Sequence, residues 1–94
     1  MIQMHNPPHP GEVIREWLAG ITVTEAAGRL DIARVSLSRL LNGVSGVSAD
    51  MDVRLSKALG TTSGYWLGLQ ADYDLWQARR HFKWHVRPII TTVA

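Results

Sequence analysis

The chain has 94 residues, of which 46% are hydrophobic and 19% charged; its formal net charge is +2 and it contains no cysteine. A chain of this length is expected to form one domain with one modest core, which excludes large substrate-binding architectures. The lack of thiols excludes disulfides, zinc ribbons and cysteine nucleophiles. Because no apolar run suits a membrane span or a secretory signal either, we expect a cytoplasmic protein.

Charge is distributed unevenly along the chain. Residues 1–78 carry six basic and eight acidic side chains and so net −2, whereas residues 79–94 net +4 and contain no acid. The basic residues of this end are Arg79, Arg80, Lys83 and Arg87. A basic C-terminal segment of this kind either binds a polyanion or an acidic protein surface, or is simply a solvated terminus.

Prolines at positions 7, 8 and 10 predict an extended lead-in over residues 1–9 and a helix that begins at Pro10, because proline suits the first helical position. Gly20 is a position where this helix can end. Five apolar residues recur on one side of the segment and are expected to face the core: Val13, Ile14, Trp17, Leu18 and Ile21.

A capping box at residues 22–25 predicts the start of a second helix. In this arrangement the Thr22 hydroxyl accepts a hydrogen bond from the Glu25 amide, and the Glu25 carboxylate reaches back. A stripe of mostly small side chains would let another helix approach closely: Val23, Ala26, Ala27 and Leu30. Asp31 is expected in a left-handed turn conformation.

A third helix is predicted over residues 33–41, ending at Asn42 and Gly43. The helical wheel places one group of side chains on the inner side: Ser36, Leu37, Leu40 and Leu41. A second group, which contains no acid, spreads over the outer arc: Arg34, Val35, Ser38, Arg39 and Asn42.

Two further helices follow. Ser48 is predicted to cap the fourth, with Asp50 and Asp52 in its first turn and Gly60 at its end. Thr62 or Ser63 is predicted to cap the fifth, which reaches Arg80. Four residues of this helix form a heptad-like seam: Trp66, Leu69, Tyr73 and Trp76. The seam is either a dimer interface or part of the internal core. The core is favoured for Trp66 and the dimer interface for Trp76.

Residues 81–94 form a basic aromatic tail. Four alternatives are open for this tail: an added strand, a contact with a protein partner, a contact with DNA, or a mobile end. Phe82, Trp84 and Val86 alternate with polar residues, which mildly favours a strand that ends before Pro88. The sequence otherwise predicts an all-α domain over residues 10–80.

The second and third predicted helices, joined by a tight turn, match the size of a helix-turn-helix. Small alanines between the two helices would let the second helix of the pair project from the protein surface. There it can enter the major groove of DNA, which is about 12 Å wide. Arginine suits guanine acceptors and phosphates, asparagine can pair with adenine, and valine can touch a thymine methyl. Any surface helix has a polar outer arc, however, so the wheel alone leaves DNA binding and a solvated face as equal alternatives.

Residues 27–43 resemble the helix-turn-helix of the Cro/C1-type (XRE) superfamily. Residues 9–12, 38–43, 51–60 and 66–76 are similar to segments of the HigA antitoxins, in the same order and with similar gaps. The resemblance implies a five-helix, lambda-repressor-like fold and a homodimer that binds palindromic operator DNA. It further implies neutralisation of a HigB-type mRNA-cleaving toxin and repression of the operon that encodes both proteins.

Carried over position by position, the resemblance assigns DNA contacts to the recognition helix and to the start of the supporting helix: Arg34, Val35, Ser36, Ser38, Arg39 and Asn42, with Thr22 and Thr24. The chain departs from the pattern where relatives usually have a turn glycine and a capping serine, since it has Asp31 and Ala33. It also has Val44 and Ser45 where relatives often have basic residues, which removes expected phosphate contacts from that loop.

Two alternatives within the same fold are a Cro-like repressor without a toxin partner and an interaction module that binds little DNA. A metal-dependent enzyme is the rival from another class, because His5/His9 and His81/His85 are spaced i, i+4. No glutamate accompanies either pair in a His-Glu-x-x-His arrangement. The neighbouring acids Asp50/Asp52 and Asp72/Asp74 suit capping or solvation, so we expect neither catalysis nor a cofactor.

Overall fold

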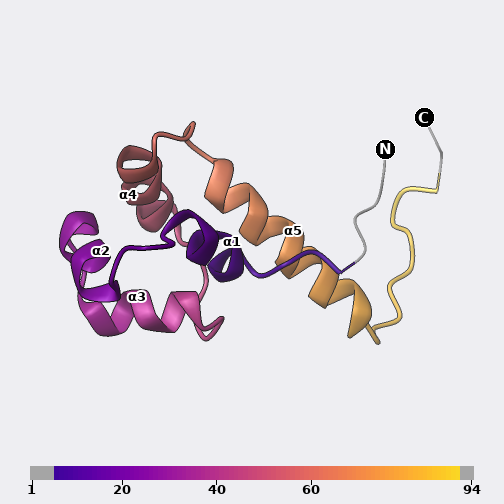
Figure 1. Cartoon of the computed structure of the whole chain (residues 1–94). Helices are drawn as coiled ribbons and strands as arrows, with labels where there is room; N and C mark the ends of the chain where they lie inside the picture. The colour runs from indigo at the N-terminus through magenta and orange to yellow at the C-terminus, as the bar shows by residue number, and fades with distance from the viewer. Residues whose placement is uncertain (1–5, 92–94) are drawn as a thin grey trace.

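The computed structural model describes residues 6–91, and the described chain is all-α. Five helices follow one another in sequence: α1 (Pro10–Trp17), α2 (Val23–Leu30), α3 (Arg34–Leu41), α4 (Ala49–Leu59) and α5 (Tyr65–Arg80). α1 to α4 form a bundle at one end of the molecule. α5 extends away from this bundle and leads into the C-terminal tail (Figure 1). The prediction of five helices is confirmed.

α1 begins where the sequence predicts and packs very closely against α3. The Nδ1 atom of His9 accepts a hydrogen bond from the Gly11 amide at 2.9 Å and so caps the helix, with Pro10 in its first turn. A β-carbon at Gly11 would overlap the carbonyl oxygen of Leu40. Glycine therefore allows the start of α1 to touch the end of α3.

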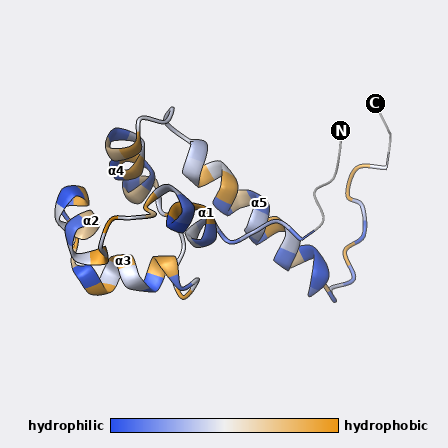
Figure 2. Ribbon diagram, in the orientation of Figure 1, coloured by the Kyte–Doolittle hydropathy of each residue, from blue (hydrophilic) through white to orange (hydrophobic). Residues whose placement is uncertain are grey.

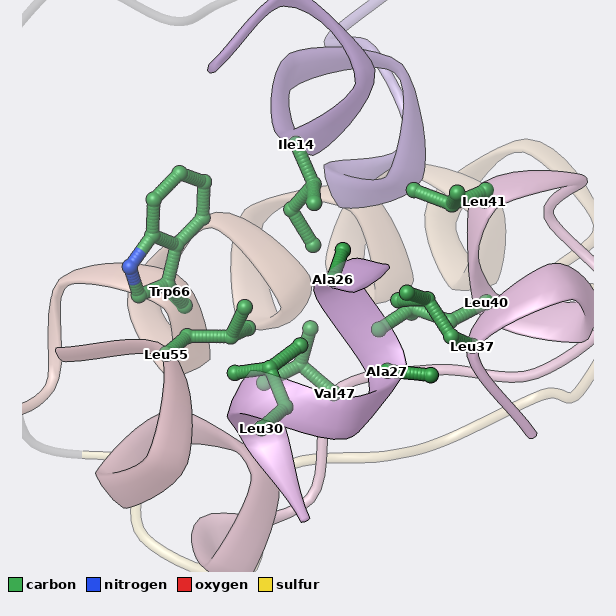
Figure 3. Close-up of a cluster of buried hydrophobic side chains, with 10 residues drawn as sticks. All are labelled: Ile14, Ala26, Ala27, Leu30, Leu37, Leu40, Leu41, Val47, Leu55 and Trp66. Carbon is green, nitrogen blue, oxygen red and sulfur yellow. The ribbon is translucent and has the colours of Figure 1, made fainter. Parts of the chain in front are cut away.

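The core lies between the helices of the bundle and receives residues from all of them (Figure 3). Its buried members are Ile14, Ala26, Ala27, Leu30, Leu37, Leu40, Leu41, Val47, Leu55 and Trp66. The prediction that Trp17 and Ile21 face this core is wrong, because they are 46% and 42% exposed. Trp17 instead lies at the rim, where its ring meets the ring of Trp66 edge-on at 5.6 Å.

The turn between α2 and α3 is held from outside the helix-turn-helix. Asp31 adopts the predicted left-handed conformation, with φ 58°. The Nη1 atom of Arg54, on α4, donates to the carbonyl oxygens of Leu30 and Asp31, each at 2.8 Å. These bonds satisfy carbonyl groups that the end of α2 leaves without helical partners. The turn is thus fastened even though Ala33 offers α3 no side-chain cap.

The predicted capping box is half formed. Thr22 Oγ1 accepts the Glu25 amide at 3.1 Å, as expected. The Glu25 carboxylate does not reach back to the cap and instead pairs with Arg29 at 2.9 Å, one helical turn further along α2.

α5 is capped by a residue of another helix. Ser48 caps α4 as predicted, accepting the Met51 amide at 3.1 Å. Thr62 and Ser63 do not cap α5, because its N-cap is Gly64, a residue with φ 90° and no side chain. The cap comes from Asp52 on α4, whose Oδ1 and Oδ2 accept the amides of Gly64 and Leu67 at 2.8 Å each.

Beyond α5 the chain is extended. Residues 82–91 contain no strand, so the predicted alternation does not lead to sheet pairing in this part of the chain. Trp84 and Ile89 are 69% and 95% exposed. Figure 2 shows polar and apolar residues alternating along this tail. No helix within residues 6–91 combines the length and apolar character that crossing a membrane requires.

Candidate nucleic-acid interface

α3 has one buried face and one outward face. Leu37, Leu40 and Leu41 lie in the core, whereas Arg34, Arg39 and Asn42 are exposed and Ser38 is half-buried. Val35, also on the outward face, is 66% exposed, so an apolar side chain is available there beside the two arginines. The wheel placed Ser36 on the inner side, but Ser36 is exposed, because the buried face of this short helix is narrower than expected.

Small residues hold α3 in this position. Ala26 and Ala27 of α2 are buried against the core with Leu37 of α3. Because an alanine side chain is a single methyl group, the two helices lie close together without burying the outer face of α3. Thr22 and Thr24, at the start of α2, are both exposed. All of the residues assigned to DNA by resemblance thus retain some exposed surface, and their contacts with DNA stay predictions.

Asn42 is already engaged within the chain. The Oδ1 atom of Asn42 accepts a hydrogen bond from Nη2 of Arg15, and its Nδ2 atom lies 3.5 Å from the Ser38 hydroxyl. Arg15 also donates from Nε to the carbonyl oxygen of Leu41 at 3.0 Å. Asn42 is therefore a junction between α1 and α3, a role that helical periodicity did not reveal.

Sequence reasoning missed Arg15 altogether. Arg15 lies 27 residues before Asn42 in the chain, and its helix was interpreted through its apolar side alone. An available signal was its position on the polar side of α1, four residues after the capped start at Gly11. Like Arg34 and Arg39, Arg15 is exposed, and its guanidinium lies at the C-terminal end of α3.

The predicted dimer seam on α5 needs one correction. Trp66 has 0% exposure and donates from Nε1 to the Thr61 hydroxyl at 2.9 Å, so it belongs to the core of its own chain. Leu69 is half-buried against the same core. Tyr73 meets the ring of His9 at 5.0 Å, and Trp76 is half-buried beneath the guanidinium of Arg80 at 4.6 Å.

The histidine pairs do not assemble a metal centre in the described part of the chain. His9 uses Nδ1 to cap α1, while His5 lies outside the described residues. His81 and His85 are exposed at and beyond the end of α5. Among residues 6–91, no three histidine, aspartate or glutamate side chains lie together as metal ligands would.

Comparison with known proteins points to one type of domain. A family model described as helix-turn-helix matches residues 13–67, which include α2, α3 and α4 in full. Virulence-associated protein A′ of Dichelobacter nodosus is 50% identical over 78 residues, covering 80% of this chain and 68% of that protein.

Solved structures of similar proteins include complexes with DNA. The Pseudomonas aeruginosa protein PA4674, crystallised with its operator DNA, is 31% identical with a TM-score of 0.77, covering 80% of this chain and 86% of that one. The P. aeruginosa antitoxin HigA, solved with the higBA promoter, is 27% identical with a TM-score of 0.80, covering 90% of this chain and 100% of that one.

Proposed function

Because this chain belongs to the XRE-type helix-turn-helix family, in which similar proteins carry the name HigA, we propose that it is a DNA-binding antitoxin that represses its own operon. The observation that carries the proposal is the outward face of α3, which combines arginine, serine and an exposed valine with no acid. That face occurs on the second helix of the pair, the one that enters the major groove in helix-turn-helix proteins.

In this proposal α3 reads base edges and its flanks hold the backbone. Arg34 and Arg39 offer planar donor forks that match the two acceptors of guanine or a pair of phosphate oxygens. Val35 suits the methyl group of thymine, and Ser36 and Ser38 suit either a base or a phosphate. Thr22 and Thr24 present hydroxyl groups to the backbone at the start of α2.

Two copies are needed for specificity, since one short helix contacts few base pairs. A twofold pair reads two half-sites about 34–36 Å apart on one face of the duplex. We propose that the dimer forms along α5 through Trp76, with Leu69 and Tyr73 beside it, because α5 projects beyond the bundle that carries α3 (Figure 1). Light scattering tests this: Trp76→Asp should convert a dimer to a monomer, and a wild-type monomer would contradict it.

The similarity to an antitoxin named HigA supports a toxin as the protein partner. We propose that the partner is a HigB-type mRNA-cleaving toxin encoded by the neighbouring gene. Co-expression tests this: the neighbouring gene alone should arrest growth, and this chain should relieve the arrest. If growth stays arrested although this chain is expressed and folded, the toxin proposal is contradicted. The chain is then a repressor without a toxin partner.

DNA binding is tested by footprinting the purified protein on the DNA immediately upstream of its own gene. Arg39→Ala should weaken operator binding by about 1–3 kcal/mol and relax selectivity at one position in each half-site. Lys57→Ala is the matched control, because Lys57 is an exposed cation on α4, outside the proposed interface. If Arg39→Ala weakens binding equally on every DNA sequence, Arg39 contacts a phosphate and not a base. If footprinting finds no protected region, the operator proposal is overturned.

A further inference from the structure

We propose that Arg15 of α1 is a phosphate-binding residue of the DNA interface, placed at the end of α3 by Leu41 and Asn42. The inference rests on the proposed function and deepens it by assigning a backbone contact to a helix outside the helix-turn-helix. Its ligand is a phosphate group of duplex DNA, which a guanidinium fork recognises without regard to sequence.

The side chain of Arg15 is already oriented by the end of α3. Its Nε donates to Leu41 O at 3.0 Å and its Nη2 donates to Asn42 Oδ1, so the plane of the guanidinium is fixed at two points. A guanidinium carries five N–H donors, and these two bonds leave the remainder available. Arg15 is exposed, so those donors face solvent at the exit of α3.

The charges at the end of α3 also favour a phosphate contact by Arg15. The C-terminal end of a helix presents carbonyl oxygens with partial negative charge, which repel a phosphate. The loop that follows α3, residues 43–47, contains only glycine, valine and serine, so it supplies no cation at that end. Arg15 supplies one from α1: it neutralises the last carbonyl groups of α3 and presents positive charge where the loop lacks it.

The same contacts change the expected role of Asn42. Pairing with adenine requires the amide oxygen of asparagine as acceptor and its nitrogen as donor on one base edge. Here the oxygen is held by Arg15 and the nitrogen faces the Ser38 hydroxyl. Asn42 is therefore a positioning residue that orients Arg15, and its contribution to binding does not depend on base sequence.

The test measures binding to two 30-base-pair duplexes, approximately three helical turns each, one from upstream of the chain's own gene and one of unrelated sequence. Binding is titrated over a range of salt concentrations. Each neutralised phosphate contributes about 0.9 to the slope of log affinity against log salt. Arg15→Gln should therefore reduce the slope by about 1.8 for a dimer. It should weaken binding to both duplexes by similar factors. Lys57→Gln removes the same charge from α4 and should change neither slope.

Two further variants separate a phosphate contact from a structural role. Arg15→Lys keeps the charge but cannot bridge Leu41 and Asn42 at once, so it should retain most of the salt slope with weaker binding. Asn42→Ala should weaken binding to both duplexes equally. Thermal melting of each variant establishes that the protein is folded at the temperature of the titration.

The outcomes distinguish this inference from the proposed function. If the wild-type protein binds and Arg15→Gln has the same salt slope as Lys57→Gln, Arg15 is not a phosphate contact and only the inference fails. If Asn42→Ala weakens binding to the upstream duplex but not to the unrelated one, Asn42 reads a base and the positioning role is overturned. If the wild-type protein binds neither duplex, the proposed function fails as well.

Discussion

The carboxylate of Asp52 on α4 accepts a hydrogen bond from the backbone N–H of Leu67 on α5 at 2.8 Å. Its other oxygen accepts the Gly64 amide, so one side chain satisfies two amides at the start of a neighbouring helix. The same interaction caps α5 and joins it to the bundle that carries α3. Asp52 therefore determines where α5, the proposed dimer helix, begins.

Acid should weaken this junction. The amides of Gly64 and then Leu67 hold the pKa of the Asp52 carboxyl below its usual value, which means that the folded state favours the charged form. Stability from Asp52 is therefore complete above the unfolded pKa of about 3.9 and is lost as the pH falls from there through the folded value. Thermal melting followed by circular dichroism should show a falling melting temperature below about pH 4.

Asp52→Asn tests whether the Asp52 carboxylate caps α5. In this variant the side-chain amide nitrogen, itself a donor, would face one of the two backbone N–H groups and could not accept its hydrogen bond. We expect a lower melting temperature at pH 7 and a smaller further loss between pH 5 and pH 3, approximately the range in which aspartate titrates. Asp72→Asn, an exposed acid on α5, should leave the melting temperature at pH 7 unchanged. An Asp52→Asn protein as stable as the wild type at pH 7 would contradict the capping role.

Two glycines should respond in opposite ways to the same substitution. Gly28 lies within α2 with no atom within 4 Å of the position of an added β-carbon, so Gly28→Ala should raise the free energy of unfolding by about 0.5–1 kcal/mol. At Gly11 the added carbon would overlap Leu40 O, so Gly11→Ala should lower it by about 1–3 kcal/mol. Urea denaturation measures both, and equal effects would show that the close approach of α1 and α3 is absent.

Replacing Trp66 or Trp84 with alanine should change the free energy of unfolding by very different amounts. Trp66 is fully buried and its indole N–H is bonded to Thr61, so Trp66→Ala should lower the free energy of unfolding by about 3–5 kcal/mol. Trp84 is 69% exposed in the tail, and Trp84→Ala should change that free energy by less than about 0.5 kcal/mol. A large effect at Trp84 in urea denaturation would mean that the tail packs on the domain in solution.

Asp31 stands in a conformation that glycine adopts without strain. With φ 58° at the end of α2, Asp31→Gly should raise the free energy of unfolding by about 0.5–1 kcal/mol, after the greater freedom of glycine in the unfolded chain is included. Operator binding should be unchanged, because Arg54 continues to hold the backbone carbonyls of the turn. A loss of stability would indicate that the Asp31 side chain contributes a contact of its own.

The features that the sequence determined by itself are those set by local interactions. Thr22 and Ser48 each cap a helix three residues before the amide that they accept, and Gly60 ends α4 because glycine adopts the left-handed conformation readily. The spacing of Leu37, Leu40 and Leu41 likewise identifies the buried face of α3. Each of these signals involves residues less than about two helical turns apart, so periodicity and capping rules detect them.

The tertiary structure alone decided the contacts that join the helices. Arg15 meets Leu41 from 26 positions away, Arg54 meets Leu30 from 24, and Asp52 meets Leu67 from 15. No helical period relates such residues; they meet because packing of the apolar faces brings one helix beside another. For the same reason Trp17, apolar and correctly spaced, lies at the rim of the core: spacing defines a face, while the neighbouring helices determine how much of that face is covered.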